Sequence, residues 1–377
     1  MNSISSTTAV AVLAFLFAGD ALSHAAQSFT LLPHLPGMNR TESTDISGDG
    51  LTVVGGSQVG TSVYSPSTAF RWTAAGGMTA LPVPDGTIRG IANAVSYDGS
   101  AVAGTYSLTV VPFAVPQAFR WTESDGLQIL PTLPNATTIN REAFGISGDG
   151  RIAVGSGRSN VNAVSSLYWD GASTPVNLFS GRAMGVNHDG SVIAGSFSWN
   201  STTRFYRWTK ESGVSIISLP PGCLFSNANA MSADGSTIVG TGIYSPLTDR
   251  AIRWTQQAGI VTLPLIQGWT MSRALDVSAD GKVVVGEVVR DRSGNPGQAF
   301  YWSEATGIVY LRALLYPSVP DDWVLIRATG VSDDGLTVTG IARRGGDFRT
   351  FVATIPAPGM GFTAVAGCLL LLARRRR

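Results

Sequence analysis

Arginine residues recur at one position of a repeated pattern, and they are the residues best placed to do chemistry. Each lies four to six residues before the aliphatic residue that opens a Ser-x-Asp-Gly-like motif: Arg40, Arg89, Arg141, Arg182, Arg273 and Arg327. A guanidinium group suits carboxylate or sulfate, and like charges in a confined cleft focus the field on anions. If these segments converge on one axis, the sequence predicts an anion-binding ring. The alternative is that each arginine caps loop carbonyls and ties neighbouring repeats together.

Tryptophans in the long, variable loops are the second set of candidate binding residues: Trp199, Trp269 and Trp323. Recognition usually lies on loops held by a rigid scaffold, and flat amphipathic rings suit sugars. Antiparallel strand order would place these loops at the same end as the arginines. We therefore expect one binding face, with plain loop packing as the alternative.

Few residues could support catalysis. Beyond the predicted leader, His34 and His188 are the only histidines, and the sequence shows no triad, metal cluster or glycine-rich phosphate loop. The acids around Ser47 have calcium-loop spacing, but the twelfth position is Gly56, so a turn is predicted and no metal or cofactor is expected. Four acids on the expected binding face leave open a glycosidase pair, whose separation the sequence does not give: Asp85, Glu142, Asp321 and Asp322.

The arginines depend on a motif that recurs seven times, with its Asp at positions 49, 98, 149, 189, 234, 280 and 334. The first copy, residues 46–55, has an aliphatic strand on each side of an Asp-Gly turn, which indicates a hairpin. A period of 40 to 54 residues predicts propeller blades or solenoid turns. Residues 89–134 contain four such strands, the content of one propeller blade.

The third strand of each repeat carries an aromatic stripe, as in Phe70-Arg71-Trp72, which we expect to pack between blades. The seventh repeat ends after this strand, whereas residues 28–36 form a spare fourth strand before the first repeat. A ring closed by this N-terminal strand would have no exposed sheet edges. We therefore predict an all-β fold, a seven-bladed β-propeller of four-stranded blades over residues 28–355.

These Ser-x-Asp-Gly and Phe-Arg-Trp-Thr elements resemble those of a bacterial extracellular family named after its His-Ala-Phe motif, the HAF repeats. The resemblance covers roughly residues 28–355, and it implies a secreted, propeller-like domain without a settled activity. The matching positions here lack the histidine of the motif: Thr68-Ala69-Phe70, Gln117-Ala118-Phe119 and Gln298-Ala299-Phe300.

Both ends of the chain carry targeting signals. Residues 1–25 read as a signal peptide, with a short apolar run and small residues before the expected cleavage site. The C-terminal residues 356–377 resemble the PEP-CTERM sorting signal, which implies a processing enzyme of the inner membrane as a partner. Ala357 stands where that signal has Glu, and a simple tail anchor is the alternative. The segment combines a Pro motif, an apolar run and a basic stop: Pro356, Ala357, Pro358, Gly359, then Arg374, Arg375, Arg376 and Arg377.

The composition excludes a strongly charged binding surface. Charged residues make up 14% of the 377, and the core without Asp20 and the four terminal arginines has 22 basic and 24 acidic residues. Nucleic-acid binding is therefore not expected. We predict a secreted or surface-attached, monomeric, non-catalytic module that binds an acidic exopolysaccharide or a surface protein. A polysaccharide lyase or glycoside hydrolase is the alternative, and a purely structural envelope component the third.

Overall fold

The computed structural model describes residues 27–60, 65–108, 115–134, 136, 141–158, 164–199, 202–245, 248–291 and 296–356. These residues form 28 strands and one four-residue helix, α1 (Leu311–Leu314). No helix in these ranges is long and apolar enough to span a membrane. The all-β prediction is confirmed for the described part of the chain.

The strands are grouped in antiparallel fours, here called units, and four units form separate sheets. Their strands are β10 (Arg141–Ile146), β11 (Ile152–Arg158), β12 (Val164–Asp170) and β13 (Val176–Ser180); β14 (Arg182–Val186), β15 (Val192–Trp199), β16 (Thr202–Thr209) and β17 (Gly213–Ile216); β18 (Phe225–Met231), β19 (Thr237–Ser245), β20 (Thr248–Thr255) and β21 (Gly259–Thr262); β22 (Met271–Val277), β23 (Val283–Val289), β24 (Gln298–Ser303) and β25 (Gly307–Tyr310).

The remaining strands share one twelve-stranded sheet. They are β2 (Arg40–Ile46), β3 (Thr52–Gln58), β4 (Ser67–Thr73) and β5 (Gly77–Ala80); β6 (Arg89–Val95), β7 (Ala101–Ser107), β8 (Gln117–Thr122) and β9 (Gly126–Ile129); β26 (Val324–Val331), β27 (Thr337–Arg344), β28 (Asp347–Thr354) and β1 (Ser28–Leu31). Within this sheet, antiparallel groups of four meet through two single-residue parallel bridges, Arg40 with Phe348 and Ser67 with Arg89.

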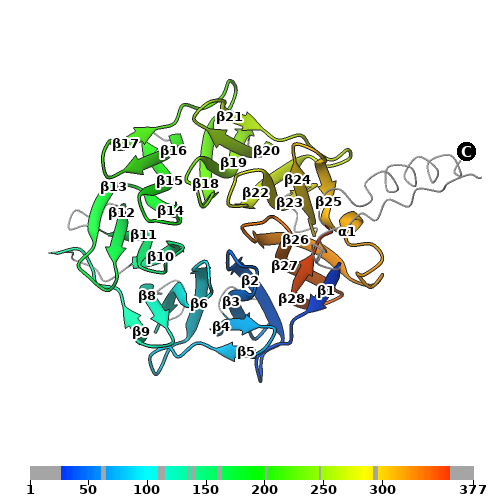
Figure 1. Cartoon of the computed structure of the whole chain (residues 1–377), viewed down its shortest axis with the longest axis horizontal. Helices are drawn as coiled ribbons and strands as arrows, with labels where there is room; N and C mark the ends of the chain where they lie inside the picture. The colour runs from blue at the N-terminus through cyan, green and yellow to red at the C-terminus, as the bar shows by residue number, and fades with distance from the viewer. Residues whose placement is uncertain are drawn as a thin grey trace, which may run out of the picture.

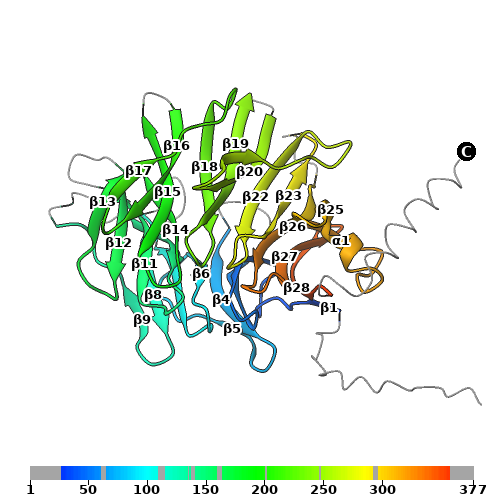
Figure 2. The ribbon, with the colours of Figure 1, turned by 45° about the horizontal axis from the view of Figure 1, so that its top comes forward.

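The units are arranged around a common centre, with the first strand of each nearest to it (Figure 1). β1 pairs antiparallel with β28, from Ser28 opposite Thr354 to Leu31 opposite Phe351. The tilted view in Figure 2 shows the same neighbours. This is the pairing that the spare N-terminal strand led us to expect, and it brings the two ends of the described chain together.

Hydrogen bonds stabilise each Asp-Gly turn internally and link it to the next turn. In the first turn, Ser47 Oγ accepts from the Thr52 amide at 2.9 Å and donates to Asp49 Oδ1 at 2.5 Å, while Gly50 has φ 74°. Each turn also donates a backbone amide to the carbonyl of the next turn, and the last donates to the first: Asp49 to Tyr97, Tyr97 to Gly148, Gly148 to His188, His188 to Ala233, Asp234 to Ala279, Ala279 to Asp333 and Asp333 to Gly48.

The core lies between neighbouring units. One cluster joins Val239 and Ala251 of one unit to Val284 and Phe300 of the next. The third-strand aromatics are fully buried at Phe70, Phe119, Phe205, Phe300 and Phe351, so the prediction of an aromatic stripe between units is confirmed. Burial of such rings and of the aliphatic side chains around them stabilises the contact between adjacent units.

A β-bulge interrupts the first strand of each unit and turns one extra side chain toward the centre. The bulge residues are Thr44, Asn93, Phe144, Met184, Asn229, Leu275 and Thr329. At each bulge a second-strand glycine lies against a first-strand carbonyl. A Cβ at Gly55 would lie 2.1 Å from the carbonyl oxygen of Glu42, so only glycine fits.

Candidate functional site: the arginine-side cavity

Two cavities meet at the bulge residues, all seven of which line both. The turn-side cavity, about 180 Å³, lies toward the Asp-Gly turns. The arginine-side cavity, about 820 Å³, lies toward the starts of the first strands. We call the two together the axial channel.

Four arginines, each from a different unit, line the arginine-side cavity: Arg89, Arg158, Arg182 and Arg327. Arg182, at the start of β14, is the most exposed of the six predicted arginines, and its side chain is 54% exposed. Its Nη1 lies 3.8 Å from Glu142 Oε2, and its guanidinium lies 5.8 Å from the centre of the Phe144 ring. Glu42 and Glu142 also line the cavity, which therefore offers both donors and acceptors.

Arg40, Arg141 and Arg273 do not line this cavity. The expectation that six arginines surround one channel mouth is therefore corrected to three of the six. Arg141 is 6% exposed and donates from Nε to the Leu130 carbonyl, and burial lowers its pKa. Arg40 pairs with Glu42 and lies over the Phe348 ring. For Arg141 and Arg40 the alternative prediction, packing between repeats, describes the structure better.

Arg273 is held by two buried carboxylates, Asp249 at 2.9 Å and Glu287 at 3.1 Å. Burial works to lower the pKa of Arg273, but these partners outweigh it and raise that pKa. The second oxygen of Glu287 accepts from Arg327 at 3.0 Å. One buried glutamate thus links Arg273 to Arg327, which does line the cavity.

The tryptophans do not form the expected exposed aromatic face. Trp323 is 3% exposed and packs in the core cluster beside α1, with Arg344 against its ring. Trp269 is partly buried and donates from Nε1 to the Tyr310 hydroxyl at 2.7 Å. Trp199 ends β15, and its side chain lies outside the described part of the structure. For Trp269 and Trp323, the alternative of loop packing is the observed arrangement.

The four acids considered for a glycosidase pair are placed apart. Glu142 lines the arginine-side cavity, whereas Asp85 is exposed on the loop between β5 and β6. Asp321 pairs with Arg312 and Asp322 with Arg344 on the loop before β26. Among the described residues, no cluster of three or more His, Cys, Asp or Glu side chains could hold a metal ion.

A hydrogen-bonded chain of acid, histidine and hydroxyl joins two strands and the segment after β1. Asp347 Oδ1 lies 3.2 Å from His34 Nε2, and His34 Nδ1 lies 2.8 Å from Thr41 Oγ1. The order is that of a nucleophilic triad. Thr41 is fully buried, however, and its hydroxyl also bonds Ser57, so a substrate does not reach it. The chain links the segment after β1 to β2 and β28.

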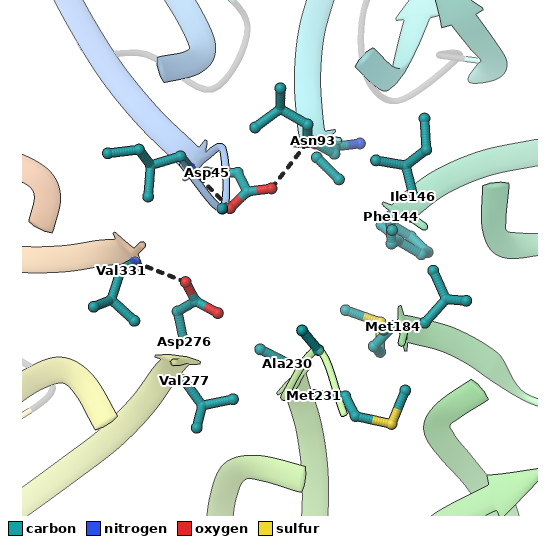
Figure 3. A pocket seen from close by; sticks show the side chains of 18 of the residues that line it. Asp45, Asn93, Phe144, Ile146, Met184, Ala230, Met231, Asp276, Val277 and Val331 are labelled. Carbon is teal, nitrogen blue, oxygen red and sulfur yellow. Dashed lines mark hydrogen bonds between the residues drawn. The ribbon is translucent and has the colours of Figure 1, made fainter. Parts of the chain in front are cut away.

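The turn-side cavity is lined by carboxyl groups, and no arginine or lysine is among its described lining residues. Asp45 accepts amide hydrogen bonds from Ile46 at 2.8 Å and from Val95 of the next unit at 2.9 Å (Figure 3). Asp276 similarly accepts from Val331 at 2.8 Å. Burial, only partly offset by these amides, raises the pKa of Asp45 to about 7, and burial followed by the charge of Asp45 raises the pKa of Asp276.

Three side chains from the Asp-Gly turns also line the turn-side cavity: Tyr97, His188 and Asp333. Tyr97 and His188 meet edge to face, with ring centres 5.5 Å apart. Glycines leave the room for them, since a Cβ at Gly48 would lie 2.4 Å from Tyr97 and one at Gly148 would lie 2.0 Å from His188. Burial raises the pKa of Asp333, against the charge of His188.

Sequence reasoning missed the bulge residues, although a signal for them exists. Each stands two positions before the aliphatic residue that opens the Ser-x-Asp-Gly-like motif, as Thr44 does before Ile46. Its type varies between Thr, Asn, Phe, Met and Leu. A variable residue at a fixed place in a repeat is typical of a position that faces a shared cavity.

No model of a known protein family matches the chain, and no curated protein does. Solved structures are similar in fold. An oligogalacturonate lyase in complex with manganese is 12% identical, with 89% of this chain and 98% of that one covered and a TM-score of 0.55. The β-propeller domain of the trilobed protease from Pyrococcus furiosus is 10% identical, with coverages of 84% and 95% and a TM-score of 0.54.

The chain folds as a β-propeller. A third neighbour, oligogalacturonate lyase from Vibrio parahaemolyticus, is 10% identical, covers 88% of this chain and 97% of its own, and has a TM-score of 0.54. At such identities the likeness shows the scaffold and not the chemistry, because one scaffold hosts many functions. The resemblance to HAF repeats stays a prediction.

Proposed function

We propose that this propeller is a non-catalytic binding module whose arginine-side cavity binds an acidic extracellular polysaccharide. The observation that carries the proposal is the convergence of Arg89, Arg182 and Arg327, from three units, on one cavity of about 820 Å³. Guanidinium groups in a partly enclosed site attract carboxylate or sulfate more strongly than they do in open water. A surface protein with an acidic segment is the competing ligand.

We infer that the architecture is a closed ring of seven blades. The support comes from the seven Asp-Gly turns, whose backbone hydrogen bonds run from each turn to the next and back to the first. The two single-residue bridges divide the twelve-stranded sheet into three groups of four, and β1 supplies the fourth strand beside β28. Such a ring brings arginines from distant parts of the sequence to one cavity.

We further propose that the module is exported and displayed at the cell surface. The predicted signal peptide, residues 1–25, and residues 357–377 of the predicted sorting segment lie outside the described residues. Pro356, the first residue of that segment, directly follows the last described core residue, Ile355. A processing enzyme that reads the C-terminal signal would then be a transient partner of a monomer.

The test is a glycan array probed with the full chain and with two variants. Arg182→Ala removes the exposed cavity arginine, and Arg204→Ala removes an exposed arginine of the same unit that does not line the cavity. We expect binding to acidic glycans, at least tenfold weaker for Arg182→Ala, unchanged for Arg204→Ala, and weakened by salt.

Three results would change the proposal. Absence of binding to any acidic glycan, or equal binding by Arg182→Ala and the parent chain, would reject the acidic-polysaccharide site. Shortened products, detected by mass spectrometry, would favour the lyase or hydrolase instead. Binding of acidic proteins alone would favour the protein partner.

A further inference from the structure

The seven bulge residues are not equivalent, because four are polar and tie their unit to a neighbour. Thr44 donates to the Ala92 carbonyl at 2.5 Å, and Asn93 donates to the Ala143 carbonyl at 2.7 Å. Asn229 donates to the Ala274 carbonyl at 2.6 Å. Thr329 bonds the Ser43 hydroxyl at 2.9 Å. These four side chains are accounted for by the assembly of the fold.

Phe144 and Met184 occupy the same position in two consecutive units but have no polar group with which to tie them. Both line the turn-side and the arginine-side cavities, and both are partly exposed there. Figure 3 shows the two side chains next to each other on one side of the channel, across from Asp45 and Asp276. Leu275, the third apolar bulge residue, stands next to Asp276 in β22, so Phe144 and Met184 are the two apolar bulge residues that come from consecutive units.

Phe144 lies near the most exposed of the cavity arginines, Arg182. The Arg182 guanidinium is 5.8 Å from the Phe144 ring centre. Glu142 stands two residues before Phe144 in β10. An aromatic face, a cation and a carboxylate acceptor thus occupy one corner of the arginine-side cavity. A ligand that matches this corner has an apolar face, an anionic group at its edge and hydroxyl groups.

Resting on the proposed function, we propose that Phe144 and Met184 form a platform for one pyranose ring of a hexuronate-containing oligosaccharide. The C–H face of the sugar packs on the Phe144 ring, which removes apolar surface from water on both partners. The carboxylate of the same sugar pairs with Arg182, and a sugar hydroxyl donates to Glu142. The site therefore selects a carboxylated ring over a linear polyanion of equal charge.

The experiment compares two ligands by calorimetry on the full chain: a hexuronate tetramer, and a tetraglutamate peptide with uncharged ends and the same charge. Phe144→Leu keeps an apolar side chain but removes the flat face. Phe348→Leu is the matched control, since that ring also lies against an arginine, Arg40, but does not line the cavity. Thermal unfolding of each variant checks that the fold is retained.

We expect the parent chain and Phe348→Leu to prefer the hexuronate at least tenfold, and Phe144→Leu to lose that preference while retaining tetraglutamate binding. Equal affinity of the parent chain for the two ligands, or an unchanged preference in Phe144→Leu, would overturn the platform but leave the arginine site standing. If neither ligand binds the parent chain and no other acidic glycan does, both the platform and the proposed function are rejected.

Discussion

The two ends of the axial channel are built from the same strands, but their side-chain contacts differ in how regularly they repeat. At the turn end, the turn serines bond within their own motif, as Ser47 pairs with Asp49 and Thr52, and a backbone amide of each turn reaches the next turn. At the arginine end, equivalent arginines reach unlike partners: Arg141 is buried, while Arg182 is half-exposed. The repeated motif therefore specifies the same contacts in every unit at the turn end. At the arginine end, the partners differ from unit to unit, and so does the exposure of each arginine.

Of the variants considered, Gly55→Ala should cause the largest loss of stability. The added Cβ would lie 2.1 Å from the Glu42 carbonyl oxygen, and backbone on both strands would have to move. We expect a loss of about 4 kcal/mol or more in unfolding free energy, or failure to fold. Gly56→Ala is the adjacent control, because its nearest neighbour lies 3.6 Å away. Similar unfolding midpoints in urea for the two variants would contradict the close approach at the bulge.

The paired acids of the turn-side cavity should make stability depend on pH. Because the folded-state pKa of Asp45 is raised to about 7, the folded chain holds a proton that the unfolded chain releases near pH 4. Stability should therefore fall as pH rises from about 4 to 7, by up to about 4 kcal/mol.

Denaturant titrations across that range measure this slope, and Asp45→Asn should reduce it. Turn carboxylates of the Asp98 kind do not obscure it, since the pKa of Asp98 is lowered and its contribution is lost only below about pH 4. Asp276 and Asp333, whose pKa values are also raised, add to the same slope and leave part of it in Asp45→Asn. A slope of the same size in Asp45→Asn would show that this carboxyl is not the source.

At the arginine end, the comparison rests on the unfolding free energies of two variants at equivalent positions, Arg141→Ala and Arg182→Ala. Arg141→Ala removes a buried guanidinium that donates to the Leu130 carbonyl, and should destabilise the chain by about 2 kcal/mol. Its effect on binding of a hexuronate tetramer should be less than threefold. Tenfold weaker binding by a stably folded Arg141→Ala would place this residue in the site.

Arg182→Ala should weaken hexuronate binding but change the unfolding free energy least of these variants. Its pair with Glu142 is 3.8 Å long and partly exposed, so its loss should cost less than about 1 kcal/mol. A large drop in melting temperature would mean that Arg182 supports the fold and is not free to serve a ligand.

The sequence was sufficient for the features that the repeats have in common. The Asp-Gly hairpins, the buried aromatic of the third strand and the pairing of residues 28–31 with the last strand all follow from residues that recur. The partners of Arg273 did not follow, because they are Glu287 and Asp249, and Glu287 stands where no other repeat has an acid. Trp323 was misjudged because the segment around α1 folds over the core and buries it.

The central claim is that ligand binds at the arginine end of the channel and not at the turn end. The direct measurement is the affinity of a hexuronate tetramer for two double variants of the full chain, Arg89→Ala with Arg182→Ala and Tyr97→Ala with His188→Ala. We predict that the first loses affinity at least thirtyfold and that the second changes it less than threefold. Loss of affinity in the second with retention in the first would contradict the account.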